Sequence, residues 1–395
     1  MTGRDELMDS MMSRRTMLST AGAAGVAALA GCSGGNSSSD GTTSSSNGGG
    51  GSASNTVNIL AWGGYGGPAK MLESNSSAKT NIKLISSDQK GFQLLSSGGT
   101  SDYDVLISDN SWVAKNAQAG HLLPLKKSDF PSQENWVEQY KWPFNPFVSE
   151  DKQYGVPSRW GWDSIGYNSE KVDSTDLDSY EFAWTGGPNG KYEGKIIVGG
   201  DPTWYIPMVA MELGIKPYKK MSQDELDQIK DKLIKTFNNA YSIHTSSAPV
   251  RKELLSGDAW IQVGLGNFGL SQLAAQGHEK FKGAIPKTGG IYWTEGMSLV
   301  KDPHNANLAK QYMQTVLSPE GQYKVCYGGA TKGIPVNKNA WSKFSAEEQK
   351  AAMFYQGKDF SASQEVLDKC VQYEIPPSYQ EWNKIWEEAK ARASV

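Results

Sequence analysis

Short apolar runs alternate with segments of helical periodicity from Thr56 to the C-terminus. Each run has the length of a buried strand and is followed by turn residues. Such alternation predicts an α/β fold with mostly parallel sheets. Strands are expected at residues 57–61, 82–85, 105–107, 164–167, 195–198, 260–263 and 297–300.

Capping residues predict where several helices begin. Ser222 and Glu225 form a capping box ahead of apolar residues that share one helical face. The last helix should present Trp382 and Trp386 on one face. Other helix starts are expected at Asp302-Pro303, at Ser318-Pro319 and at Ser378, where Glu381 completes a second box.

The N-terminal segment has the features of an export signal. Residues 13–18 read Ser-Arg-Arg-Thr-Met-Leu, a twin-arginine pattern, and the weakly hydrophobic run 21–30 is too short for a permanent span. It ends at Cys32 in a lipobox-like sequence, which predicts lipidation of that thiol. We expect residues 1–32 to be the signal, residues 33–55 to be a flexible Ser/Gly-rich tether, and the protein to be lipid-anchored outside the cytoplasmic membrane.

Length, charge and hydropathy exclude several classes of protein. The 395 residues suit two lobes rather than one core. Lys and Arg number 39 against 42 Asp and Glu, so no broad basic face for nucleic acid is expected. A mean hydropathy of −0.51 argues against a multispanning membrane protein. The 13 tryptophans and 17 tyrosines exceed what a core needs and indicate aromatic rings in a binding site.

Motifs for metal binding or catalysis are missing from the sequence. Its four histidines lie singly, and there is no CxxC, GxSxG or HExxH pattern, so neither a metal nor a cofactor is expected. Cys326 and Cys370 can form a disulfide or remain buried thiols. The segment 264–269 reads GxGxxG after a predicted strand, but no acid follows at the spacing of a dinucleotide site. An exported oxidoreductase or hydrolase stays an alternative function. For the segment itself, a tight strand-to-helix loop is the simpler interpretation.

A second glycine-rich loop, residues 62–68, places Trp62 and Tyr65 among four glycines between a predicted strand and a helix. Large rings beside glycines make poor core material, whereas they can stack on a ligand while the glycine amides face an anion. This pattern favours a ligand loop.

Several segments together resemble the extracellular solute-binding proteins of ABC importers, in the spermidine/putrescine-binding branch. The most specific of them is Pro-Lys-Thr-Gly-Gly-Ile-Tyr-Trp-Thr-Glu at residues 286–295. The others are the segments 59–65, 103–108, 119–125, 154–161 and 165–168.

The resemblance implies a type II periplasmic-binding-protein fold with a ligand cleft between two lobes that close as a hinge. The first lobe would comprise residues 56–163 plus 296–340, and the second residues 164–295 plus 341–395. No reaction would be catalysed. The implied partners are a membrane permease with its ATPase, and a monomer is expected.

The same resemblance implies a set of ligand-binding residues. Trp62, Tyr65 and Trp293 match rings of the polyamine branch, Asp201 matches an acid that pairs with an ammonium group, and Glu295 stands where the branch has Asp. Trp204 replaces an expected second carboxylate, and Leu265 an expected Trp. Fewer acids suit a small cationic or zwitterionic amine. Arg159 can meet an anion or form an ion pair. Receptors of the same fold for another anion, an amino-phosphonate, a sugar or iron are the alternatives.

Overall fold

The computed structural model describes residues 55–329 and 332–393, which all fall within one compact unit. The predicted signal, Cys32 and the tether as far as residue 54 lie outside the described residues. Within the described ranges, no helix is both long enough and apolar enough to cross a bilayer.

One mixed sheet of twelve strands runs through the described part of the chain, with the main order β2-β1-β3-β12-β7-β10-β8-β9. The outer strands at each end pair in parallel, as expected, whereas β12 and β7 in the middle run antiparallel to their neighbours. The parallel strands are β1 (Thr56–Ala61), β2 (Lys79–Leu84) and β3 (Val105–Asp109) in the first lobe, and β8 (Ile196–Gly199), β9 (Ala240–His244) and β10 (Ile261–Gly266) in the second.

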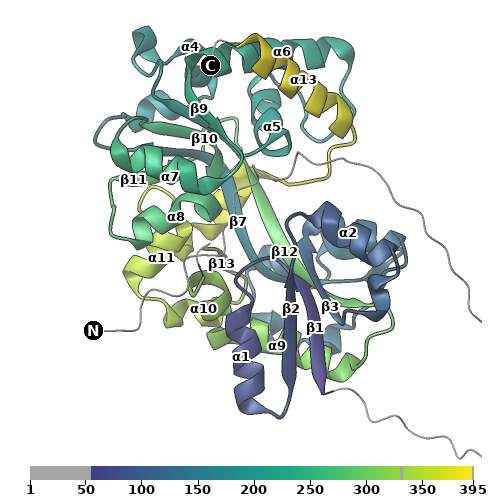
Figure 1. Cartoon of the computed structure of the whole chain (residues 1–395). Helices are drawn as coiled ribbons and strands as arrows, with labels where there is room; N and C mark the ends of the chain where they lie inside the picture. Colours follow the sequence, from purple (N-terminus) through teal and green to yellow (C-terminus); the bar gives the residue numbers. More distant parts are fainter. Residues whose placement is uncertain (1–54, 330–331, 394–395) are drawn as a thin grey trace, which may run out of the picture. The chain divides into compact units, whose positions relative to one another are not determined.

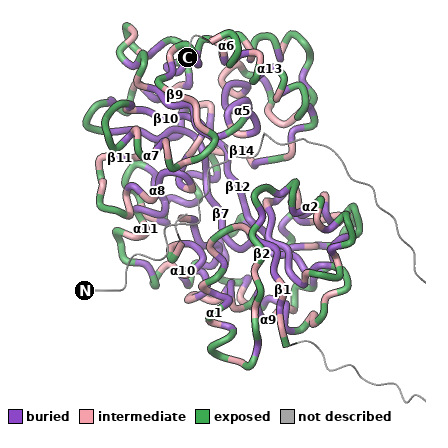
Figure 2. The backbone as a smooth tube through the Cα atoms, viewed as in Figure 1, coloured by how far each residue is buried: buried purple, intermediate pink, exposed green. Residues whose placement is uncertain are grey.

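The two middle strands, β7 (Val156–Asn168) and β12 (Gly290–Val300), join the two lobes (Figure 1). Every residue of both strands is buried (Figure 2). They are much longer than the predicted strands at 164–167 and 297–300, because their buried polar residues interrupt the apolar pattern by which a strand is read. Side chains alternate along β12. We call the face with Trp293 and Glu295 the front face, and the face with Tyr292 the back face.

Helices cover both ends of the sheet (Figure 1). The first lobe contains α1 (Gly66–Asn75), α2 (Asp88–Ser96), α3 (Asn110–Gln118), α9 (Ala306–Leu317) and α10 (Pro319–Tyr327). The second contains α4 (Glu181–Thr185), α5 (Pro202–Glu212), α6 (Gln223–Asn239), α7 (Ser247–Ser256), α8 (Asn267–Ala275) and α13 (Tyr379–Arg392). Helix α11 (Ala346–Met353) packs against α8, and α12 (Ser363–Lys369) leads into β14 (Cys370–Gln372), which pairs with β12. The short strands are β4 (Leu122–Leu123), β5 (Val148–Ser149), β6 (Lys152–Gln153), β11 (Phe281–Ala284) and β13 (Ile334–Pro335).

Three of the four predicted helix starts are found, although the capping box predicted at Ser378 and Glu381 is not formed: α13 begins at Tyr379 without a side-chain cap. Ser222 and Glu225 form the expected capping box of α6. Trp382 and Trp386 are buried in the core of the second lobe. The start predicted at Asp302-Pro303 is wrong: α9 begins at Ala306, where the Asn305 side chain accepts a hydrogen bond from the Leu308 amide (3.0 Å). Asp302 has a φ of 58°, which places it in a left-handed turn before the helix.

Cys326 and Cys370 are free thiols in the structure, so the disulfide alternative is not realised there. Burial raises the pKa of both thiols, which keeps them protonated and slow to react.

In a Cys32→Ser variant, Ellman's reagent should label neither thiol quickly in native protein and both in denaturant. A disulfide would leave denatured protein unlabelled unless it is first reduced.

Candidate ligand-binding site

Several polar and aromatic residues follow the carboxyl ends of parallel strands in both lobes, which is where open α/β sheets bind ligands, whereas Trp293 and Glu295 lie within the crossing strand β12. In the first lobe, Trp62 follows β1 directly and Asp109 ends β3. In the second lobe, β8 ends at Gly199 and Asp201 caps the following helix, α5. The topology therefore presents aromatic and acidic side chains from both lobes.

The loop between β1 and α1 is anchored through Tyr65. The Tyr65 ring is buried, and its hydroxyl donates to Glu295 Oε2 (2.6 Å) and lies 2.6 Å from the Ser158 hydroxyl. Trp62, at the start of the loop, remains half-buried. Of the two predicted rings, Tyr65 is thus part of a buried network, whereas Trp62 is the more accessible.

Glu295 forms a buried ion pair with Arg159. Arg159 Nε and Nη2 donate to the two carboxylate oxygens at 2.9 and 2.8 Å, and their side chains are 1% and 5% exposed. Burial acts to lower the pKa of Arg159, but the charge and hydrogen bonds of Glu295, together with Tyr65 and Cys326, outweigh it and the pKa is raised. The guanidinium group is therefore charged, and both oxygens of Glu295 already have donors.

A pair of carboxyl groups that sequence reasoning missed lies beside this network. Asp88 and Asp109 hydrogen-bond to each other, and the Asp109 amide also donates to Asp88 Oδ1 (3.2 Å). Burial raises the pKa of Asp88 to about 7, and burial with the Asp88 and Glu295 charges raises the pKa of Asp109 well above its ordinary value. At neutral pH the pair therefore holds at least one proton.

Tyr373, just after β14, contacts both lobes. Its carbonyl oxygen accepts hydrogen bonds from Asn110 Nδ2 (2.6 Å) and Ser111 Oγ (3.2 Å) of the first lobe. Its ring stacks on Trp204 of the second lobe, with centroids 4.4 Å apart and planes at 18°. Burial raises the pKa of its hydroxyl, and so do the charges of acids from both lobes, Asp88, Asp109 and Asp201.

The remaining predicted residues lie on or near the front face. Trp293 is buried and packs edge-to-face against Phe268 at 5.6 Å. Its ring lies over Gly161 of β7, where a Cβ atom would come within 2.2 Å of the indole. Asp201 is exposed and accepts from the Thr203 amide (2.9 Å) and hydroxyl (2.5 Å). The structure therefore joins Tyr65 and Glu295 in one hydrogen-bonded network and stacks Trp204 on Tyr373, whereas Asp201 acts on Tyr373 only through its charge.

The GxGxxG segment at residues 264–269 is occupied by internal contacts. The Gly266 amide donates to the buried carboxylate of Asp163 in β7. The Asn267 side chain accepts from the Trp162 amide (2.8 Å) and donates to the Ala352 carbonyl (3.1 Å). The segment is thus a packed strand-to-helix loop whose polar groups serve the fold.

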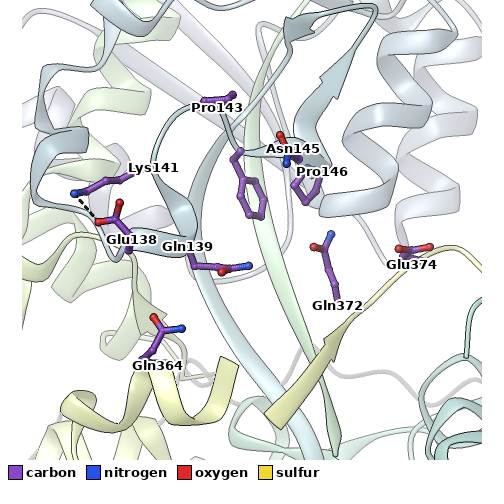
Figure 3. Close-up of a pocket in the computed structure, with 10 residues that line it drawn as sticks. Glu138, Gln139, Lys141, Pro143, Asn145, Pro146, Gln364, Gln372 and Glu374 are labelled. Atoms are coloured by element: carbon purple, nitrogen blue, oxygen red, sulfur yellow. Dashed lines mark ion pairs between the residues drawn. The ribbon is translucent and has the colours of Figure 1, made fainter. Parts of the chain in front are cut away.

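A cavity of about 610 Å³ lies on the back face (Figure 3). Tyr292 borders this region, with hydrogen bonds linking its hydroxyl to Gln139 (3.3 Å) and Gln372 (2.8 Å). Among its lining residues only Phe144 is buried. The front face therefore remains the better candidate, because buried charged groups and rings converge there. The cavity is lined by Glu138, Gln139, Lys141, Pro143, Phe144, Asn145, Pro146, Gln364, Gln372 and Glu374.

The described residues contain no cluster of side chains that could bind a metal ion together. Over residues 55–329 and 332–393, no group of three or more His, Cys, Asp or Glu side chains is arranged to hold a metal ion.

A two-lobed α/β fold with rings and acids at strand ends in both lobes suits the binding of a small ligand. Comparison with known sequences agrees: the profile of the bacterial extracellular solute-binding proteins matches residues 79–353. The chain belongs to this family, and it is a substrate-binding protein of an ABC importer.

The relatives point to one branch of the family. The chain is 25% identical over 284 residues to the putrescine-binding periplasmic protein SpuD of Pseudomonas aeruginosa, covering 68% of this chain and 75% of that protein. It is 23% identical over 302 residues to the spermidine/putrescine-binding periplasmic protein of Escherichia coli, covering 75% and 81%. The structure of the spermidine/putrescine substrate-binding protein PotD of Streptococcus pneumoniae superimposes with a TM-score of 0.69, at 18% identity over 86% of this chain and 99% of that one.

The buried carboxyl group of Asp163 makes the free energy of unfolding depend on pH. Burial raises the pKa of its carboxyl from 3.8 to about 7. The folded protein therefore binds this proton more tightly than the unfolded chain, and stability is lost as the pH rises from 4 towards 7. Asp163→Asn keeps an oxygen acceptor for the Gly266 amide, so it should remove a slope of about 1.4 kcal/mol per pH unit.

The measurement is the free energy of unfolding in urea at several pH values between 4 and 8. Asp227→Asn is the control, because hydrogen bonds from Lys230 and Gln223 lower the pKa of Asp227 to below this pH range, so the variant should leave the slope between pH 4 and 8 unchanged. An Asp163→Asn slope equal to that of the wild type would contradict this assignment.

Proposed function

We propose that the protein captures a small cationic or zwitterionic amine between its two lobes and delivers it to a membrane permease. The observation that supports this most is the position of Tyr373, whose carbonyl oxygen accepts from Asn110 and Ser111 of the first lobe while its ring stacks on Trp204 of the second. The charges of Asp88, Asp109 and Asp201 all raise the pKa of its hydroxyl. The putrescine- and spermidine-binding relatives support the same class of ligand.

The residue types suit an ammonium group. Trp62 and Trp204 are half-buried rings whose π faces can attract a cation, by about 2 kcal/mol where water is excluded. The Asp88–Asp109 pair holds a proton when no ligand is present, and an arriving ammonium group would replace that proton as the neutralising charge.

The number of available acids favours few positive charges on the ligand. Glu295 is already paired with Arg159, and Trp204 stands where a second carboxylate was expected. A monoamine, a diamine or a zwitterion with one amino group therefore fits better than a longer polyamine. Receptors of this fold for an anion, an amino-phosphonate, a sugar or iron remain the competing functions.

Lobe closure is part of the proposal. The lobes would comprise residues 56–163 plus 296–340 and residues 164–295 plus 341–395, and they would rotate about β7 and β12. Tyr373 supports this arrangement because it contacts the first lobe through its carbonyl group and the second through its ring.

Calorimetry with the purified chain tests the ligand class directly. Putrescine, spermidine, 4-aminobutanoate and glycine betaine should include at least one ligand of micromolar affinity. Ribose, phosphate and ferric citrate represent the competing functions. Binding of one of these with no binding of any amine would refute the proposal.

Asp201→Asn separates charge from structure in the second lobe. Asparagine caps a helix as well as aspartate does, so α5 should remain intact. Loss of the charge should weaken binding of a cationic amine about fivefold. The matched control is Asp173→Asn, since Asp173 caps its own turn through the Thr175 amide (3.0 Å) and hydroxyl (2.8 Å) in the same way. Equal affinities of both variants would remove Asp201 from the site.

Lipid anchoring at Cys32 would keep this receptor close to its permease and ATPase, and we propose that it acts there as a monomer. Cys32→Ser removes the thiol that would carry the lipid. The variant should move from the membrane fraction to the soluble fraction while its ligand affinity is unchanged. A wild type that is already soluble after export would exclude the anchor.

A further inference from the structure

We infer that Arg159 is a specificity-determining residue, which neutralises Glu295 and thereby lowers the number of positive charges that the site accepts. The inference deepens the proposed function and rests on it, since it concerns the same front-face site.

The guanidinium group is held on every side. Besides its two bonds to Glu295, Arg159 donates from Nη2 to the Gly63 carbonyl (3.1 Å) and from Nη1 to the Val325 carbonyl (3.0 Å). These four contacts come from β12, the β1–α1 loop and α10. Such a fork cannot swing out to meet a ligand without breaking all of them.

Two glycines make room for this side chain. A Cβ atom at Gly64 would come within 3.0 Å of Arg159 Nη1, and one at Gly333 within 3.0 Å of Arg159 Cδ. Gly64 also has a φ of 105°, a conformation that glycine adopts readily. The surroundings are thus shaped around the arginine from two separate parts of the chain.

The ion pair changes the charge that a ligand meets. Glu295 lies opposite Asp109 in the register of β12 and β3, and its charge acts on both Asp88 and Asp109. Without Arg159, three carboxyl groups would face the ligand from the first lobe and the crossing strand. With Arg159 in place, only the Asp88–Asp109 pair remains uncompensated there. The arginine also fixes the backbone next to Trp62 through the Gly63 carbonyl.

Three ligands that differ only at one end measure the charge preference. They are 1-aminobutane, putrescine and 4-aminobutanoate, which end in a methyl, an ammonium and a carboxylate group. The readout is the ratio of putrescine affinity to 1-aminobutane affinity, determined by calorimetry at pH 7. A merely structural loss weakens all three ligands together and leaves this ratio unchanged.

The two single variants should change the ratio of putrescine affinity to 1-aminobutane affinity in opposite directions. Glu295→Gln leaves a buried positive charge, so the ratio should fall at least about fivefold and 4-aminobutanoate should gain affinity. Arg159→Met frees the carboxylate, so the ratio should rise by a similar factor. The double variant should return to within about twofold of the wild-type ratio, because the two charges cancel.

Two further variants distinguish an effect of charge from a loss of structure. Arg159→Lys keeps the charge but loses the fork, so absolute affinities should fall while the ratio stays at its wild-type value. Arg251→Met removes another arginine, one that contacts Ser247 and Gly269 in the second lobe, and it should leave the ratio unchanged. If Arg159→Met does not fold, Glu295→Gln and Arg159→Lys decide the question.

Three negative results are distinguishable. Failure of every amine to bind, spermidine and glycine betaine included, overturns the proposed function and this inference together. A wild type that binds spermidine or glycine betaine but none of the three test ligands overturns only this inference. A wild type that binds one of them, with a ratio that Glu295→Gln leaves unchanged, overturns only the role of Arg159.

Discussion

The arrangement of the front face depends on a single buried ion pair. Arg159 on β7 and Glu295 on β12 are paired across the two strands that join the lobes, and the same guanidinium holds the β1–α1 loop and the end of α10. A buried charge without its partner would destabilise the fold by about 3–5 kcal/mol, whereas the intact pair offsets its own desolvation through well-aligned hydrogen bonds. The ion pair therefore constrains the positions of Trp62 and Tyr65 as well as the local charge.

The acids around this pair have divided roles. Glu295 is paired with Arg159, and Asp201 is a helix cap that stays exposed. Asp88 is buried and Asp109 half-buried, and the Asp109 amide donates to the Asp88 carboxyl group. A resemblance based on residue types alone cannot distinguish these roles, because the function of a carboxylate depends on which donors surround it. The three kinds of environment explain why a site with several acids can still suit a ligand of low charge.

Much of the fold could be predicted from the sequence, since short strands such as β1 and β3 are mostly apolar runs between turn residues. The length of β7 could not, because Arg159 and Asp163 look like loop residues until their buried partners are known. Asp109 carried a usable signal, as it directly follows a buried strand. Tyr373 carried none: it reaches the site from a segment more than 250 residues away from Asn110, and only the folded chain brings the two together.

The two crossing strands have a consequence for how the molecule unfolds. The buried apolar residues form two clusters, and the first of them includes residues of α7, α8 and α11 as well as the first lobe. Two domains with separate cores on a linker could unfold in two transitions. Here β7 and β12 are buried along their whole length and supply pairing partners to both halves of the sheet. Neither half can lose its structure without exposing the edge of the other. The lobe closure proposed for binding is thus compatible with unfolding as one cooperative unit.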